Sequence, residues 1–314
     1  MSRLIIGTRR SKLARIQSAF VKDSLAAIFP GLDIEERIIV TTGDRILDAP
    51  LAKIGDKGLF TREIEQQLLD GDIDLAVHSY KDLPTELPAG LEVGAVLERA
   101  PVEDALIGAP GASLDNLPAG ARVGSSSLRR ISQLLRRRPD VKAVDIRGNV
   151  NTRLDKLDAG EYDALILALA GLTRMGCADR VSRVLGEDDK WLHAVGQGAL
   201  AVEVRADDSR VKEIVGALEH PPTRAATDAE RAFLRELEGG CQVPVGVFTT
   251  VLPDGRLKLS GMVAGLCGSP FYEGEEAGAT EEASALGGRL ARRLIAEGGG
   301  AVLADIRSQC PKMD

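Results

Sequence analysis

The chain has 314 residues, of which 44% are hydrophobic, 28% charged and 3% aromatic. This composition excludes a mainly disordered chain and a small disulfide scaffold, and the length predicts two or three domains. The net charge of −7 and the scarcity of aromatic residues argue against a general nucleic-acid-binding protein.

The first hundred residues alternate between strand-like and helix-like patterns. Apolar side chains recur at helical spacing from residue 11 to residue 28, and Pro30 with Gly31 ends this pattern. The polar stretch 43–58 is long enough to form a lid. The expected strands span residues 4–7, 34–40, 74–79 and 91–97, and the expected helices span residues 11–28 and 59–69.

The same alternation starts again after Pro101 and predicts an internal duplication. Residues 7–11 resemble residues 124–130, and residues 71–75 resemble residues 160–164. Two similar α/β lobes with a cleft between them are the simplest architecture for such a repeat. The expected strands of the second lobe span residues 122–124, 141–146 and 162–169, its helices span 128–138 and 149–157, and a strand at 199–205 returns to the first lobe.

A third region begins after Pro221 and Pro222. A helix over 223–238, strands over 245–251 and 257–263, and an amphipathic helix over 281–295 predict a small α+β domain. The predicted domains are therefore residues 1–98 with 199–216, residues 103–192, and residues 221–314. No membrane span is expected, because the longest apolar runs are far shorter than the roughly 20 residues that a bilayer requires. No secretory signal is expected, because residues 1–7 lack the basic and apolar regions of a signal peptide. These features predict a cytoplasmic protein.

Arginine recurs at the predicted strand-to-helix junctions. A helix N-terminus offers free backbone N–H groups, and a guanidinium can bind a carboxylate through two hydrogen bonds. Between Arg122 and Lys156 the chain has ten basic and three acidic residues. This local excess of positive charge favours a small polyanion as ligand. The junction residues are Arg9, Ser11, Ser127, Arg129, Arg130, Arg147 and Arg153.

Asp82 and Cys241 are candidates for the chemistry itself. Asp82 follows an apolar strand, at the edge where open α/β sheets bind ligands, although a turn aspartate before Pro84 is the alternative interpretation. Cys241 follows two glycines, a plausible setting for an exposed thiol, although a structural cysteine is the alternative. The spacings of cysteine and histidine along the chain indicate neither a zinc site nor a disulfide framework.

Four segments together resemble the porphobilinogen deaminase, or hydroxymethylbilane synthase, family. They are VHSYKDLP at 77–84, GSSSLRR at 124–130, RGNV at 147–150 and EGGCQVP at 238–244, and they occur in the family's order. The resemblance implies two lobes similar to type II periplasmic binding proteins. It also implies a third domain that carries a dipyrromethane cofactor on Cys241 through a thioether, with no metal.

The resemblance further implies a monomeric transferase of porphyrin and haem biosynthesis. Such an enzyme joins four porphobilinogen molecules head to tail, releases ammonia at each step and produces hydroxymethylbilane. The implied substrate-binding residues are Arg9, Ser11, Arg147, Arg153, Arg174 and Gln197. The implied cofactor-binding residues are Cys241, Ser127, Arg129, Arg130 and Lys81, the catalytic residues are Asp82 and Lys81, and the lid residues are Lys53, Lys57 and Phe60.

Two other classes of protein remain open from the residues alone. A non-catalytic two-lobed binder of a small polyanion would use the same cleft, and it predicts an export signal and no covalent adduct. A nucleic-acid-binding protein would lose affinity steeply with salt. Neither a nucleic-acid partner nor a membrane partner is expected.

Overall fold

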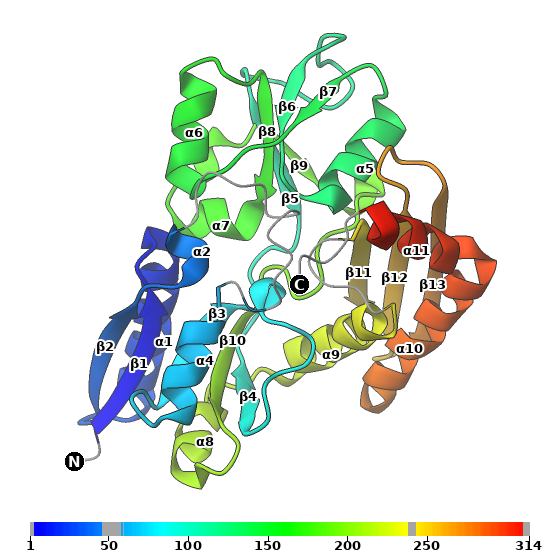
Figure 1. Ribbon diagram of the computed structural model, residues 1–314. Helices are drawn as coiled ribbons and strands as arrows, with labels where there is room; N and C mark the ends of the chain where they lie inside the picture. The colour runs from blue at the N-terminus through cyan, green and yellow to red at the C-terminus, as the bar shows by residue number, and fades with distance from the viewer. Residues whose placement is uncertain (1–2, 46–57, 59, 238–242, 310–314) are drawn as a thin grey trace. The chain divides into compact units, whose positions relative to one another are not determined.

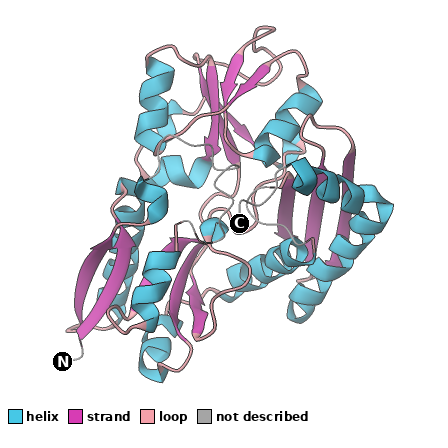
Figure 2. Ribbon diagram, in the orientation of Figure 1, coloured by secondary structure: helices cyan, strands magenta, loops and turns pink. Residues whose placement is uncertain are grey.

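The computed structural model describes residues 3–45, 58, 60–237 and 243–309. Within these residues the chain is mixed α/β, with three sheets (Figure 2). The chain forms two compact units. Among the described residues, one contains residues 3–45, 58, 60–100 and 198–224, and the other contains residues 101–197, 225–237 and 243–309.

The first unit is built on a five-stranded sheet in the order β2-β1-β3-β10-β4 (Figure 1). β1, β2 and β3 are parallel, whereas β10 is antiparallel to its neighbours β3 and β4. Helices α1 and α8 pack on one face of the sheet and α4 packs on the other. The bounds are β1 (Arg3–Arg9), α1 (Lys12–Ile28), β2 (Asp33–Ile39), α2 (Thr42–Arg45), α4 (Arg62–Leu69), β3 (Leu75–Ser79), the 3-10 turn η1 (Tyr80–Asp82), β4 (Leu91–Val96), β10 (Leu200–Arg205) and α8 (Ser209–Gly216).

The second unit contains another five-stranded sheet, in the order β7-β6-β8-β5-β9. Helix α5 packs on one face, and α6 and α7 pack on the other. The bounds are β5 (Asp104–Gly108), β6 (Arg122–Gly124), α5 (Leu128–Arg137), β7 (Lys142–Val144), α6 (Val150–Asp158), β8 (Ala164–Ala168), α7 (Leu169–Arg174), η2 (Ala178–Arg180), β9 (Arg183–Leu185) and η3 (Glu187–Asp189).

The two sheets have the same order and the same strand directions, which confirms the internal duplication. β1, β2 and β3 correspond to β6, β7 and β8, and in each sheet an antiparallel strand follows the third member. The repeat extends to single hydrogen bonds. The Asp74 carboxylate accepts from the Ile5 amide at 2.8 Å, and the Asp163 carboxylate accepts from the Arg122 amide at 2.7 Å.

The third sheet, β11-β12-β13, is antiparallel and also belongs to the second unit. Its apolar face packs against α9 and α10, as the buried cluster of Phe233, Leu259 and Leu290 shows. A small C-terminal α+β domain is therefore present. The bounds are α9 (Pro221–Glu236), β11 (Val245–Val251), β12 (Leu257–Ala264), β13 (Phe271–Gly278), η4 (Thr280–Glu282), α10 (Ala283–Leu294), the π turn η5 (Ile295–Gly299) and α11 (Gly300–Gln309).

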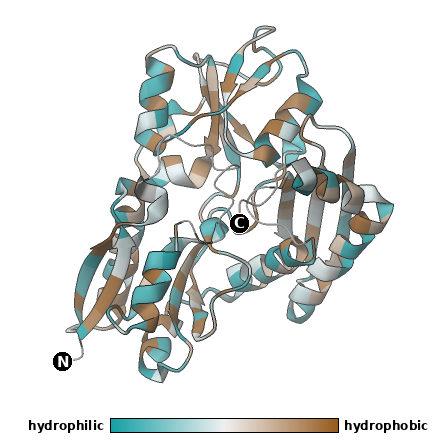
Figure 3. Cartoon of the chain, in the orientation of Figure 1, coloured by the Kyte–Doolittle hydropathy of each residue, from teal (hydrophilic) through white to brown (hydrophobic). Residues whose placement is uncertain are grey.

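The predicted elements agree with the structure within a few residues, but several elements were missed. The expected list lacked β5, β9, β13, α2, α7, α8 and α11. β13 is an edge strand whose side chains alternate between half-buried and exposed, so it has no continuous apolar signal (Figure 3). The strand expected at 199–205 is β10, and it lies in the first sheet as predicted.

Two further expectations concern larger features. The three domain boundaries and the cleft between the lobes stay predictions, because the positions of the two units relative to one another are not determined. In the described part of the chain, no helix is long and apolar enough to cross a membrane.

Candidate functional site

A small pocket lies in the first unit where β1 and β3 end. Its volume is about 60 Å³, and its lining includes Arg9, Ser11, Phe60, His78 and Asp82. Parallel strands end at the same edge of a sheet, so residues far apart in the sequence meet there. Four of the predicted site residues, Arg9, Ser11, Phe60 and Asp82, are thus brought together.

Local structure positions each of these side chains. Ser11 is the N-cap of α1, where its hydroxyl oxygen accepts from the Ala14 amide at 3.3 Å. The guanidinium carbon of Arg9 lies 4.2 Å from the centre of the Phe60 ring, a cation–π contact. Asp82 ends the 3-10 turn that follows β3 and is exposed, and Lys81 beside it is half-buried. The pocket lining therefore includes one guanidinium, one carboxylate and several hydroxyl groups, that of Ser11 among them.

A second group of predicted residues lies in the second unit, at the ends of β6 and β7. Arg147 follows β7, and Asn149 caps α6 by accepting from the Thr152 amide at 3.0 Å. Arg153 lies one turn into α6, and its Nε donates to the Gly148 carbonyl at 2.9 Å. Burial, together with the positive charges of Arg130 and Arg147, lowers the pKa of Arg153 to about 10. A cationic cluster of this kind is stabilised by an anionic ligand.

Ser127 occupies the N-cap position of α5. Unlike Ser11 and Asn149, it makes no side-chain capping bond to the described residues of its helix. Arg174, at the end of α7, is half-buried, and burial lowers the pKa of its guanidinium. Their contacts with ligand stay predictions.

Arg129 and Arg130 are buried, which the sequence analysis did not foresee. Arg129 Nη1 and Arg130 Nη2 each donate to the Asp104 carboxylate at 2.7 Å. Trp191 Nε1 and Gln197 Nε2 donate to the same carboxylate at 2.8 and 2.9 Å. The two guanidinium groups lower the pKa of Asp104 well below its usual range, against the effect of its burial.

This Asp104 cluster has consequences for three predicted roles. The arginine side chains are 4% and 7% exposed, and Gln197 is fully buried. Within the second unit these residues tie α5 and the segment around Trp191 to the start of β5. It stays a prediction that Arg129, Arg130 and Gln197 contact cofactor or substrate directly. Their hydrogen bonds to Asp104 give them a structural role as well.

Three predicted residues lie outside the described residues. They are the lid residues Lys53 and Lys57 and the cofactor cysteine Cys241. Among the described residues, no group of three or more His, Cys, Asp or Glu side chains is arranged to hold a metal ion.

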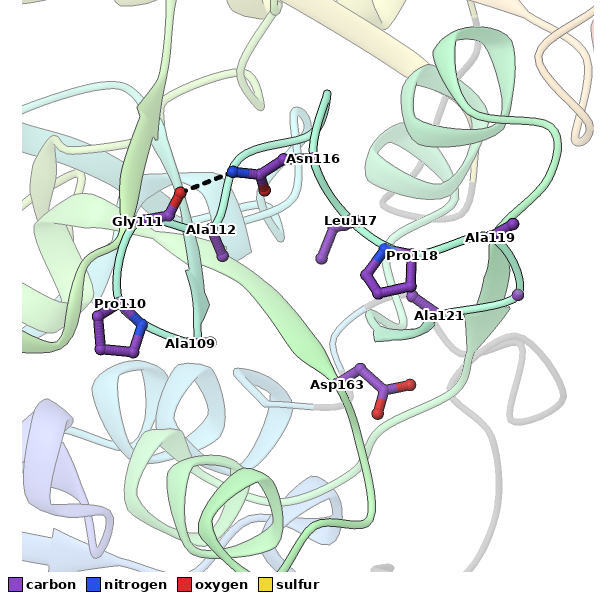
Figure 4. A pocket seen from close by; sticks show the side chains of 11 residues that line it. Ala109, Pro110, Gly111, Ala112, Asn116, Leu117, Pro118, Ala119, Ala121 and Asp163 are labelled. Carbon is purple, nitrogen blue, oxygen red and sulfur yellow. Dashed lines mark hydrogen bonds between the residues drawn. The ribbon is translucent and has the colours of Figure 1, made fainter.

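The described part of the second unit also contains a larger cavity, of about 640 Å³, whose lining includes none of these arginines (Figure 4). Its lining is mostly alanine, proline and glycine, and its one ionisable residue is Asp163. The Asp163 carboxylate already pairs with the Arg122 guanidinium at 3.1 Å. The cavity therefore lacks the cationic groups that the predicted ligand needs.

Sequence reasoning missed three buried polar residues, Asp104, His78 and Glu203. All three stand in otherwise apolar strands, and that interruption is the only signal the sequence carries. A buried ionisable residue needs a partner, but the partner here is 25 to 125 residues away. Local patterns could not identify these pairs.

The fold and the site together define a class of protein. Two equivalent α/β lobes present arginine, serine and one aspartate at strand ends, and a small sheet domain follows them. This combination suits a protein that holds a small ligand rich in carboxylates and acts on it.

Comparison with known proteins identifies the family. Residues 4–213 match the family model described as porphobilinogen deaminase, dipyromethane cofactor binding domain, and residues 225–296 match porphobilinogen deaminase, C-terminal domain. The porphobilinogen deaminase of Desulforudis audaxviator is 52% identical, over 97% of this chain and 98% of that protein. That of Synechococcus elongatus is 51% identical, over 96% and 94%. The chain belongs to the porphobilinogen deaminase family.

The structural comparison is much weaker. The solved methionine-binding protein MetQ is 13% identical, with a TM-score of 0.45 over 71% of this chain and 92% of that one. A likeness at this level supports no inference about function.

Proposed function

We propose that this chain is a hydroxymethylbilane synthase that joins four porphobilinogen molecules head to tail into a linear tetrapyrrole and releases one ammonia per step. This makes it a transferase of porphyrin biosynthesis. Family membership along almost the whole chain supports the proposal. The structural observation that carries it is a pocket in which an exposed carboxylate, Asp82, shares the lining with the Arg9 guanidinium.

The arginines anchor the substrate through its carboxylates. Each porphobilinogen carries an acetate and a propionate, so the growing chain gains negative charge with every unit. Arg9 and Ser11 in the first unit, and Arg147 and Arg153 in the second, supply the matching donors. A charge-assisted hydrogen bond of this kind contributes about 1.5–3 kcal/mol. Arg174 and Gln197 are further proposed contacts.

The second unit also fits the carboxylates of a dipyrromethane cofactor. Arg130, Arg147 and Arg153 repel one another, and this repulsion contributes to the lowered pKa of Arg153. Carboxylates bound there would offset that repulsion, with Ser127 and Arg129 as further proposed donors. Lys81, in the first unit, is also a proposed cofactor-binding residue. When attached to the Cys241 sulfur, the cofactor supplies the pyrrole carbon to which the first substrate is joined. Sulfur suits this attachment because a thiolate is a better nucleophile than a serine hydroxyl.

Asp82 is the proposed catalytic residue, with Lys81 beside it. Positive charge develops on the pyrrole as ammonia leaves, and a carboxylate at the pocket stabilises that charge. Phe60, with Lys53 and Lys57, is proposed to close over the reacting groups and to exclude water.

The proposal extends to the setting of the enzyme. We place it in the cytoplasm as a monomer, with porphobilinogen as its ligand and without a nucleic-acid or membrane partner. Cys177 and Cys267 are free thiols in the structure, which suits a reducing compartment. Size-exclusion chromatography with light scattering tests the oligomeric state, and a dimer mass would contradict it.

The deciding experiment is the intact mass of the purified protein. We expect an excess equal to two pyrrole units in the wild type and in Cys267→Ser, a control at an exposed free cysteine. Cys241→Ser should lack the excess and should not turn over porphobilinogen. An unmodified mass in active wild-type protein would reject the cofactor assignment, whereas an unmodified mass in wild-type protein without turnover would favour the non-catalytic binder.

A second experiment tests Asp82. Asp82→Asn should lower kcat by roughly 10²-fold or more and leave the fold unchanged, because it removes the charge and keeps the shape. Glu86→Gln, at an exposed carboxylate four residues further on, is the matched control and should retain wild-type rates. Near-normal turnover of Asp82→Asn would remove its proposed role.

A further inference from the structure

A buried ionisable pair forms part of the wall of the Asp82 pocket. His78 Nε2 lies 2.9 Å from Glu203 Oε2, and the two side chains are 5% and 0% exposed. β3 and β10 pair His78 with Ala201 and Ala76 with Glu203. Side chains two residues apart on a strand share a face. His78 and Glu203 therefore project from the same face of the first sheet, and His78 also lines the pocket.

Charged groups face this pair from each neighbouring element. Helix α4 covers the same face and contributes the buried carboxyl of Glu65. Burial and the nearby charge of Glu203 raise the pKa of Glu65, while His78 and Arg62 act in the opposite direction. Asp82 and Arg9 share the pocket with the imidazole. His78 thus bonds to one carboxylate and shares the pocket with a second carboxylate and a guanidinium.

Stability does not account for this arrangement. Oε1 of Glu203 and Oε1 of Glu65 are buried, and neither has a hydrogen-bond partner among the described residues. A buried polar pair of this kind is often replaced by apolar residues with no loss of stability. Buried, partly unsatisfied carboxyl groups beside a pocket call for an explanation, and such groups are typical of functional sites.

The pair has the geometry of an oriented base. With Glu203 ionised, Nε2 carries the hydrogen that is donated to Oε2, and Nδ1 keeps the lone pair. A carboxylate that holds one nitrogen of an imidazole fixes its tautomer and stabilises the imidazolium that forms when the other nitrogen takes a proton.

The proposed reaction needs such a base. When each new carbon–carbon bond forms, the C–N bond of the incoming substrate breaks and ammonia leaves with the electron pair. The attacked pyrrole carbon must then lose its proton so that the C–H electron pair restores the ring. We infer that His78, oriented by Glu203, accepts this proton. The inference rests on the proposed function, and it makes Glu203 a positioning residue.

The test compares three variants that change shape little. His78→Gln should lower kcat about 10²-fold, with KM within threefold of wild type. It should also lose the decline of kcat on the acid side, which arises because an imidazolium cannot accept a proton. Porphobilinogen deuterated at its free α-carbon should show a larger kinetic isotope effect in this variant, because proton removal becomes slower.

Glu203→Gln should shift the acid-side decline of kcat to lower pH, since the imidazolium loses its partner. Nitrogen NMR should show the Nε2–H tautomer of His78 in the wild type and a mixture of tautomers in Glu203→Gln. The chain has three histidines, so the signals can be assigned. Glu92→Gln is the matched control, because Glu92 pairs with Lys212 at the surface. It should leave kcat, the pH profile and the tautomer unchanged.

Each result decides the inference. A uniform loss of kcat across pH without a larger isotope effect would show that His78 is merely structural, and unchanged kinetics would overturn the inference outright. If His78→Gln does not fold, Glu203→Gln decides the inference alone. An unshifted pH profile of kcat together with an unchanged His78 tautomer in that variant would show that Glu203 does not orient His78. The proposed function fails separately, through absent turnover in the wild type or an intact mass without the two pyrrole units.

Discussion

Asp104 should be the most sensitive buried charge among the described residues of the second unit. Its carboxylate accepts four hydrogen bonds, at 2.7, 2.7, 2.8 and 2.9 Å, and two of the donors are guanidinium groups. Trp191 donates to Oδ2 and Gln197 to Oδ1, so Asp104→Asn keeps an acceptor oxygen for only one of them, and it leaves two arginines buried without a counter-charge. Removal of one partner from a buried ion pair costs about 3–5 kcal/mol. That loss is a large share of the roughly 5–15 kcal/mol by which a typical domain is stable.

The measurement is urea unfolding followed by circular dichroism and by the fluorescence of Trp191, the one tryptophan of the chain. Asp158→Asn is the control, because the Asp158 carboxylate pairs with the Arg180 guanidinium at 2.5 Å at the surface. Partly exposed pairs contribute about 0–1 kcal/mol, so the control should change little.

The pH dependence adds a second condition. The native pKa of Asp104 is depressed, so its contribution is complete above the unfolded value of about 3.9 and is lost only as the pH falls through the lower native value. The gap between Asp104→Asn and wild type should therefore be constant from neutral pH down to about 5 and shrink in strong acid. A gap below about 1 kcal/mol, or one that already shrinks near neutral pH, would refute this account.

Further predictions concern Glu65 and two glycines. The pKa of Glu65 is raised in the native state, so the wild type loses stability as the pH rises from the pKa of the unfolded state through that of the native state. Glu65→Gln should therefore unfold at a higher urea concentration than wild type at pH 8. Equal urea midpoints would contradict this. Gly124→Val should lower the free energy of unfolding by about 1–3 kcal/mol or more, because a Cβ there would lie 2.6 Å from Leu165 Cδ2 and 2.9 Å from Tyr162 Cδ1. An equally stable variant would show that the neighbouring side chains can move to accommodate the new atoms. Gly216→Ala, in α8 with open space around it, should instead gain up to about 1 kcal/mol, and thermal unfolding compares both variants with wild type.

Much of the fold and part of the site could be predicted from local sequence. Apolar periodicity and the stops at proline and glycine located most strands and helices, because these signals lie within a few residues of one another. The recurrence of glycine and aspartate at residues 71–74 and 160–163 predicted the duplication, and both aspartates make the same bond to the neighbouring strand. Arg9, Ser11 and Asp82 were placed at strand ends by the same reasoning.

What the sequence by itself determined is therefore the order of elements, the repeat, the positive strand ends and the family. Only the tertiary structure decided which charges are buried and which partners they have. Arg129 and Arg130 are identical in kind to Arg147 in the sequence, yet they pair with Asp104 inside the second unit. His78 meets Glu203 because β3 and β10 are neighbours in the sheet. Such pairs depend on strand order and burial, and neither is encoded in the few residues that surround each side chain.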